Sequence, residues 1–212
     1  MGGGLLPVRV AEPTAAQAMR VTAPVTLRLG RARCDAARMA LDDAATAHHE
    51  AGHAVAALTY RRSLTRVSIE ADGHSLGRVD HRPQRVVVPV RGEVSASVRR
   101  AVNADIVVAW AGPLAEERVV GSYDHVTAEH DLDRMFDQAM VVTLDHAQEA
   151  LAYVEWLRWR TVRLLREPGI WPQVEAVAAA LLEERTLSGP AVARIMETTA
   201  RRQRRPAPPS MA

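Results

Sequence analysis

The chain has 212 residues, enough for one domain of ordinary size with its own hydrophobic core. Hydrophobic residues make up 48% of it and aromatic residues 4%, so the apolar side chains are mostly Ala, Val and Leu; this favours a mainly helical fold and argues against a disordered chain. All 27 basic residues are Arg and face 25 acidic ones, and this near balance argues against binding to nucleic acid. Without Lys the chain lacks the phosphate-binding loop of an ATPase, so we expect no ATP site in it.

Cysteine content and apolar runs indicate the cellular compartment. Cys34 is the single cysteine and cannot form an intramolecular disulfide, so nothing points to an oxidising compartment. The first residues lack the basic and apolar regions of a signal peptide, and no uncharged apolar stretch reaches the roughly 18 residues that a spanning helix needs. We therefore expect a cytoplasmic protein with no membrane segment.

The first part of the chain is predicted to hold an arm, a long helix and a hairpin. Residues 1–30 mix Gly and Pro with short apolar runs, which predicts a flexible N-terminal arm with one strand over residues 21–29. Residues 35–60 are rich in Ala and contain no Pro, which favours a long, mostly buried helix. Residues 65–70 and 76–82 alternate apolar and polar side chains around a turn, which predicts a β-hairpin.

The remainder of the chain is predicted to be mostly helical. An apolar stripe over residues 94–119 indicates a helix, with Gly112-Pro113 as a kink or as a boundary between two helices. Thr127 is the predicted N-cap of the next helix, because acidic residues fill the turn that follows it. The other predicted elements are, in chain order, an extended run at 86–90, helical structure as far as 167, and helices over 172–185 and 190–198.

These elements predict one domain between two less ordered ends. Residues 31–200 are expected to form a mainly α domain of the α+β class, in which helices surround a small antiparallel sheet. Residues 201–212 are rich in Arg and Pro, which predicts a disordered tail.

The predicted long helix contains the motif HExxH, from His49 to His53. Because helical residues are about 100° apart, the two His side chains lie about 40° apart and can reach one metal ion, while Glu50 can meet a water bound to that ion. This is a metalloprotease arrangement; the alternative is a chance match in an Ala-rich helix. Gly52 is a poor helix former, so its presence predicts close approach of another backbone or of a ligand.

A zinc hydrolase usually needs a third protein ligand. The metzincin pattern requires Gly and His further along the helix, where this chain has Ala56 and Thr59, so that class is excluded. A thermolysin-like pattern would use a downstream Glu, but Glu70 ends a predicted strand instead of lying on a helix. Asp131, near the start of a predicted helix, is the better candidate on chemistry, although its spacing alone does not single it out.

Several segments, taken in order, match one known pattern. They are His-Glu-Ala-Gly-His-Ala-Val at 49–55, a hairpin over 65–77 ending in Leu-Gly, Ala-Gly-Pro-Leu-Ala-Glu-Glu within 110–121, Asp-Leu at 131–132, and Leu-Ser-Gly within 181–189. Over residues 45–198 the chain thereby resembles the peptidase domain of the FtsH-type ATP-dependent zinc proteases. It departs from the family pattern at Pro113, where Arg is usual, and at residues 126–130, which makes His130 an alternative ligand.

The resemblance implies a zincin-like helical peptidase domain over residues 31–200 with one zinc ion per chain. In that pattern His49, His53 and Asp131 bind the zinc ion and Glu50 is the general base. Glu116 and Glu117, in the segment within 110–121, are expected on a solvated or ion-paired face, with support of the metal site as the alternative.

The predicted function is that of a zinc-dependent metalloendopeptidase that cleaves unfolded proteins or peptides, which would add as a strand to the edge of the hairpin. We expect the peptidase domain to stand alone, without the family's ATPase module. Two alternatives stay open: a peptidase subunit that works only with a separate ATPase partner, and a catalytically silent, metal-stabilised interaction module. The resemblance also raises the expectation of a homo-oligomer.

Overall fold

The structure is a computed structural model, and it describes residues 25–70, 77–81, 94–122 and 125–204. For residues 25–40, 78, 81 and 125–131 it describes the backbone and not the side chain. The chain divides into two compact units, Met1–Ala40 and Leu41–Ala212, and the helix α2 (Val25–Thr59) begins in the first and ends in the second.

The described residues of the first unit are helical. Residues 25–29 were expected in a strand of a flexible arm, but they form the beginning of α2, so this prediction was wrong. The Leu, Arg and Ala residues in this part of α2 are strong helix formers. The rest of the predicted arm, residues 1–24, lies outside the described residues.

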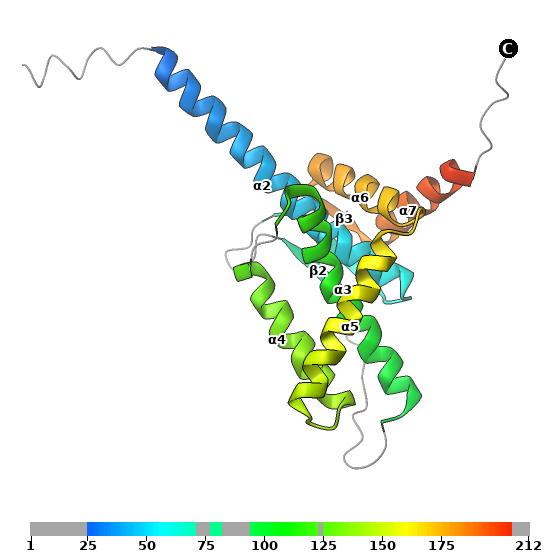
Figure 1. Cartoon of the computed structure of the whole chain (residues 1–212). Coiled ribbons are helices and arrows are strands. Elements are labelled where there is room, and N and C mark those ends of the chain that lie inside the picture. The colour runs from blue at the N-terminus through cyan, green and yellow to red at the C-terminus, as the bar shows by residue number, and fades with distance from the viewer. Residues whose placement is uncertain (1–24, 71–76, 82–93, 123–124, 205–212) are drawn as a thin grey trace, which may run out of the picture. The chain divides into compact units, whose positions relative to one another are not determined.

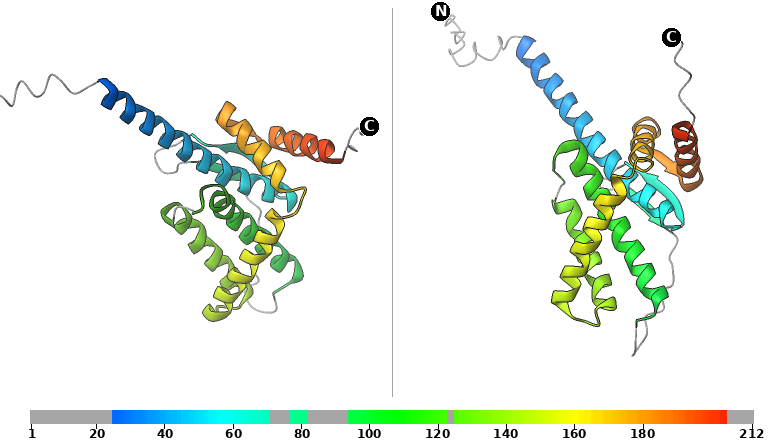
Figure 2. Two further views of the ribbon diagram at one scale, coloured as in Figure 1. Left: turned by 45° about the horizontal axis from the view of Figure 1, so that its top comes forward. Right: turned by 45° about the vertical axis from the view of Figure 1, so that its right-hand side comes forward.

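The second unit is a mainly helical fold with a small antiparallel sheet, as the sequence predicted. In this unit α3, α4 and α5 pack against one another, while α6 and α7 pack together beside the sheet (Figures 1 and 2). Its core is aliphatic, and Val55 of α2, Ile106 of α3 and Leu181 of α6 are among its fully buried side chains. The elements that follow α2 are β1 (Leu64–Ser68), β2 (Arg78–His81), α3 (Ala96–Val120), α4 (His125–Val142), α5 (Ala147–Leu165), α6 (Trp171–Glu184), β3 (Thr186–Ser188) and α7 (Gly189–Arg204).

The sheet has the strand order β2-β1-β3, and both pairings are antiparallel. The predicted hairpin is confirmed, because Val67 of β1 lies opposite Val79 of β2. The third strand is β3, whose Leu187 lies opposite Val67 on the other side; the sequence did not predict it. The extended run expected at residues 86–90 lies outside the described residues.

The helix α3 is a single element with Pro113 inside it, so Gly112-Pro113 is not a boundary between two helices. Ser95 caps its start by accepting a hydrogen bond from the backbone N–H of Val98 at 3.3 Å. Gly121 ends it in the left-handed conformation at φ 84°, which glycine adopts without the strain that a Cβ brings.

Two helix ends differ from the prediction. The helix α4 begins at His125, so Thr127 lies inside its first turn and is not its N-cap. The helix α7 continues to Arg204 and so includes the first residues of the predicted tail. An ion pair of 2.6 Å between Arg201 and Glu197, one turn apart, and the attraction of cations to a helix C-terminus both favour this extension. Residues 205–212 lie outside the described residues.

Within the part of the chain that the structure describes, no helix has the length and apolar character needed to cross a membrane.

Candidate functional site

The two histidines of the HExxH motif lie together on a buried face of α2. The side chains of His49 and His53 belong to residues that are 5% and 9% exposed. Their Nε2 atoms are 3.0 Å apart, and their rings meet edge to face with centroids 4.8 Å apart. The four-residue spacing therefore brings the two imidazoles to one point, as the helical geometry predicted.

The other nitrogen of each ring is held by α3. Nδ1 of His49 lies 2.7 Å from Oε2 of Glu116, and Nδ1 of His53 lies 2.7 Å from the carbonyl oxygen of Val108. A carbonyl oxygen and an ionised carboxylate can only accept, so each Nδ1 carries the hydrogen and donates it. In the neutral ring this assignment leaves a lone pair on each Nε2.

The lone pairs of the two Nε2 atoms are therefore close enough to reach the same ion. With a hydrogen on both Nδ1 atoms, the two Nε2 atoms at 3.0 Å attract each other when one of them carries a further proton or when both bind a metal ion. Two nitrogens that bind zinc at about 2.0–2.1 Å with tetrahedral geometry are about 3.3 Å apart, close to the observed separation. The donor chemistry of this pair, with each outer nitrogen anchored, fits a zinc ion.

Small residues bring α2 and α3 close enough for these contacts. A Cβ at Gly52 would overlap the carbonyl oxygen of Ala111 and would lie 2.8 Å from the Cβ of Ala115. A Cβ at Gly112 would overlap the ring of His53. The close approach predicted from Gly52 is thereby confirmed, and the approaching backbone is that of α3.

On α3 the contact residues form one stripe. Val108, Gly112 and Glu116 are spaced by four residues, so they lie on one side of the helix, and all three contact the His pair. Glu116 was expected on a solvated or ion-paired face, and the structure pairs it with His49; its support of a metal site stays a prediction. Glu117 lies at the surface, where its carboxylate is 4.0 Å from Arg158.

Glu50 is buried beside the histidines and is 6% exposed. The backbone just before β2 passes directly over its carboxylate: a Cβ at Gly77 would lie 2.5 Å from Oε1 of Glu50 and 2.8 Å from its Cδ. The hairpin is therefore placed against the motif helix by a residue with no side chain, and β2 leads away from this point. Since the order is β2-β1-β3, β2 is an edge strand of the described sheet.

The structure describes fewer side chains at the candidates for the third ligand. The backbone of Asp131 lies in α4, which packs against α3, but its side chain, like that of His130, is outside the described part. The carboxylate of Glu70 lies 3.5 Å from the hydroxyl of Thr186, at the exposed end of the β1–β3 pairing. Among the side chains that the structure describes, no three His, Cys, Asp or Glu residues form a group that could hold a metal ion.

Sequence reasoning missed part of this arrangement. The Val108 contact is made by a backbone carbonyl, which has no side-chain signature. Gly77 was identified only as the end of a Leu-Gly segment, with no role. For Glu116 a signal existed, because it follows Gly112 by four residues and so shares its helix face.

The comparisons with known proteins give a distant likeness. No family model matches the chain. The chain is 31% identical over 161 residues to the ATP-dependent zinc metalloprotease FtsH of Thermus thermophilus. The aligned part is 74% of this chain and 20% of the relative, so the chain spans about a fifth of the length of the protein it matches. This similarity is to a zinc metalloprotease, the class that the HExxH motif indicates.

Proposed function

We propose that the chain is a zinc-dependent metalloendopeptidase. The observation that carries the proposal is the pair of Nε2 atoms, 3.0 Å apart, on rings whose Nδ1 atoms are fixed by Glu116 and by the carbonyl of Val108. A buried pair of imidazoles with anchored outer nitrogens is the ligand arrangement of zinc sites. The distant similarity to a zinc metalloprotease supports the same class.

In this proposal three residues hold one zinc ion per chain. His49 and His53 bind through Nε2, and Asp131 supplies a carboxylate oxygen as the third ligand. The assignment of Asp131 rests on the family resemblance and on the suitability of carboxylate oxygen for zinc. Glu116 and Val108 are positioning residues, because they fix the orientation of the two rings and the tautomer of each.

Glu50 is the proposed general base. A zinc ion bound by these ligands would supply Lewis acidity to a peptide carbonyl and to water. Glu50 removes a proton from the attacking water and later gives it to the leaving amine nitrogen, which is ordinary general acid–base catalysis. The burial of Glu50 under Gly77 holds its carboxylate next to the start of β2.

The edge strand β2 offers a binding mode for the substrate. An extended peptide can pair with the outer edge of β2 through its backbone, which favours unfolded proteins and peptides over folded ones and gives little sequence selectivity. Because β2 follows Gly77, such a strand would run past Glu50. The cytoplasmic location and a homo-oligomeric state stay predictions from the sequence.

Cleavage of casein without ATP tests the proposal. We expect cleavage by the wild-type chain with zinc, and none by Glu50→Gln or after chelation. If the wild-type chain with bound zinc does not cleave casein, the chain is not a self-sufficient peptidase. Recovery of activity on adding a separate ATPase would then identify a partner-dependent subunit, and failure to recover would identify a silent metal-stabilised module.

A further inference from the structure

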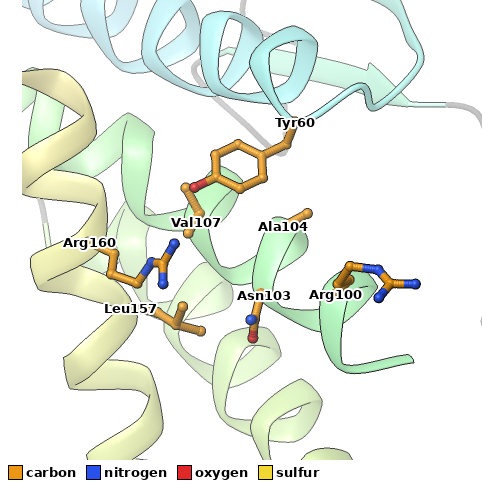
Figure 3. Close-up of a pocket in the computed structure, with 7 residues that line it drawn as sticks. All are labelled: Tyr60, Arg100, Asn103, Ala104, Val107, Leu157 and Arg160. Carbon is orange, nitrogen blue, oxygen red and sulfur yellow. The ribbon is translucent and has the colours of Figure 1, made fainter. Parts of the chain in front are cut away.

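A cavity lies between the end of α2, α3 and α5, and it shares no residue with the proposed metal site. Its volume is about 310 Å³, roughly twice that of an apolar cavity that holds benzene. Figure 3 shows Tyr60 reaching over it from the end of α2 and Arg160 reaching in from α5. It is lined by Tyr60, Arg100, Asn103, Ala104, Val107, Leu157 and Arg160.

The cavity has an apolar floor and a polar rim. Ala104, Val107 and Leu157 form the floor, and all three are buried. Val107 precedes Val108, whose carbonyl oxygen contacts His53, but Val107 itself makes no contact that the metal-site proposal uses. The floor provides room for a hydrocarbon group about the size of one aromatic ring.

The polar groups of the rim are hydrogen-bond donors. Among the described residues no carboxylate pairs with Arg160, whose guanidinium stacks over Trp156 at 5.0 Å; Arg100 lies at the far side of the rim with its guanidinium turned away from Arg160 (Figure 3). The amide oxygen of Asn103 accepts the hydrogen bond of Tyr153, which leaves its NH₂ group to donate. The hydroxyl of Tyr60 adds a further donor. Among the described residues that line the cavity there is no Asp or Glu.

We propose that this cavity binds a small organic anion, a carboxylate attached to an apolar group. The guanidinium of Arg160 reaches into the cavity, and no described acidic residue lines the cavity beside it, so it attracts a carboxylate, which Arg binds with paired hydrogen bonds. The apolar floor selects acids that carry a hydrocarbon group over inorganic anions. A free small acid and the C-terminal carboxylate of a peptide share this chemistry.

The test uses phenylacetate and its neutral analogue phenylacetamide, titrated into the full chain and followed by backbone amide shifts in NMR spectra. A ligand of this size is expected to bind with a dissociation constant on the order of 1 mM. We expect saturable shifts in α3 and α5 with phenylacetate, and binding at least about tenfold weaker with phenylacetamide, since its charge is absent. N-acetylphenylalanine represents the C-terminus of a peptide. If it binds more tightly than phenylacetate, the site is assigned to peptide C-termini; if it binds more weakly, the site is assigned to free small acids.

Variants locate the binding in this cavity. Arg160→Gln should weaken phenylacetate binding about tenfold, and Tyr60→Phe should weaken it by a smaller factor. Arg163→Gln is the matched control, because Arg163 lies on the same helix, is exposed and does not line the cavity; it should leave binding unchanged. Equal binding of the acid and its amide, unchanged binding in Arg160→Gln, or no saturable shift in the folded wild type would overturn the proposal. Binding should be unchanged in Glu50→Gln, so the outcome is independent of the peptidase proposal.

Discussion

His49 and Glu116 are 67 positions apart in the chain, and Nδ1 of His49 lies 2.7 Å from Oε2 of Glu116. This contact joins the motif helix α2 to α3 at the point where the two imidazoles converge. A charge-assisted hydrogen bond to the outer nitrogen fixes the ring and makes the inner nitrogen a better metal ligand.

Glu116→Gln is therefore expected to weaken zinc binding by about 10- to 100-fold while leaving the fold intact. The amide can still accept a hydrogen bond but carries no charge. Competition with a chelating dye measures the zinc affinity. Glu117→Gln is the matched control, since Glu117 is the neighbouring acid and lies at the surface. Equal zinc affinities of the two variants would show that Glu116 does not support the site.

Asp131→Asn is expected to lower zinc affinity and abolish casein cleavage, because the third ligand loses its charge. Asp133→Asn, at an exposed position two residues further along α4, should change neither. Zinc content after dialysis and the cleavage rate are measured for both. Full zinc occupancy and activity in Asp131→Asn would exclude Asp131 as a ligand, and a matching loss in His130→Ala would assign His130 instead.

Gly52→Ala is expected to destabilise the chain by about 1–3 kcal/mol, because the new Cβ would overlap the Ala111 carbonyl. This loss outweighs the gain of up to about 1 kcal/mol in helix propensity. Gly169→Ala is the control, since its nearest neighbour, Gln203 Oε1, would lie 3.9 Å away. Urea denaturation gives the free energy of unfolding, and a Gly52→Ala variant as stable as wild type would mean that α2 and α3 are further apart.

Gly77→Ala is expected to lower the rate of casein cleavage more than it lowers zinc occupancy. The added Cβ would lie 2.5 Å from Oε1 of Glu50, so it displaces the carboxylate of the general base and leaves the imidazoles in place. The cleavage rate and the zinc content are measured on the same sample. If activity persisted with full zinc occupancy, the carboxylate position would not depend on Gly77.

Much of the fold was predictable because local patterns determine it. The Ala-rich run around the motif and the apolar stripe of α3 agree with the tertiary packing, and the hairpin predicted from the alternation agrees with the pairing of β1 and β2. The strand β3 was not predictable in this way, since Thr186–Ser188 is too short to show alternation. It exists because Leu187 pairs with Val67, about 120 residues earlier, and sequence periodicity carries no information on such a distant partner.

The part of the site that consists of side chains at a fixed spacing along one helix was predictable from the sequence. His49 and His53 converge because a helix places residues four apart on one face. The residues around them were harder to find: the Val108 partner is a backbone atom, and Gly77 acts by having no side chain. Such contacts depend on where a second element lies, which a single helix pattern does not determine.

X-ray absorption spectroscopy of the chain loaded with one equivalent of zinc tests the central claim most directly. The account predicts two imidazole nitrogens at about 2.0–2.1 Å with oxygen in the other positions, and loss of an imidazole contribution in both His49→Ala and His53→Ala. A zinc spectrum without two imidazoles, or one that both variants leave unchanged, would contradict a metal centre at the histidine pair.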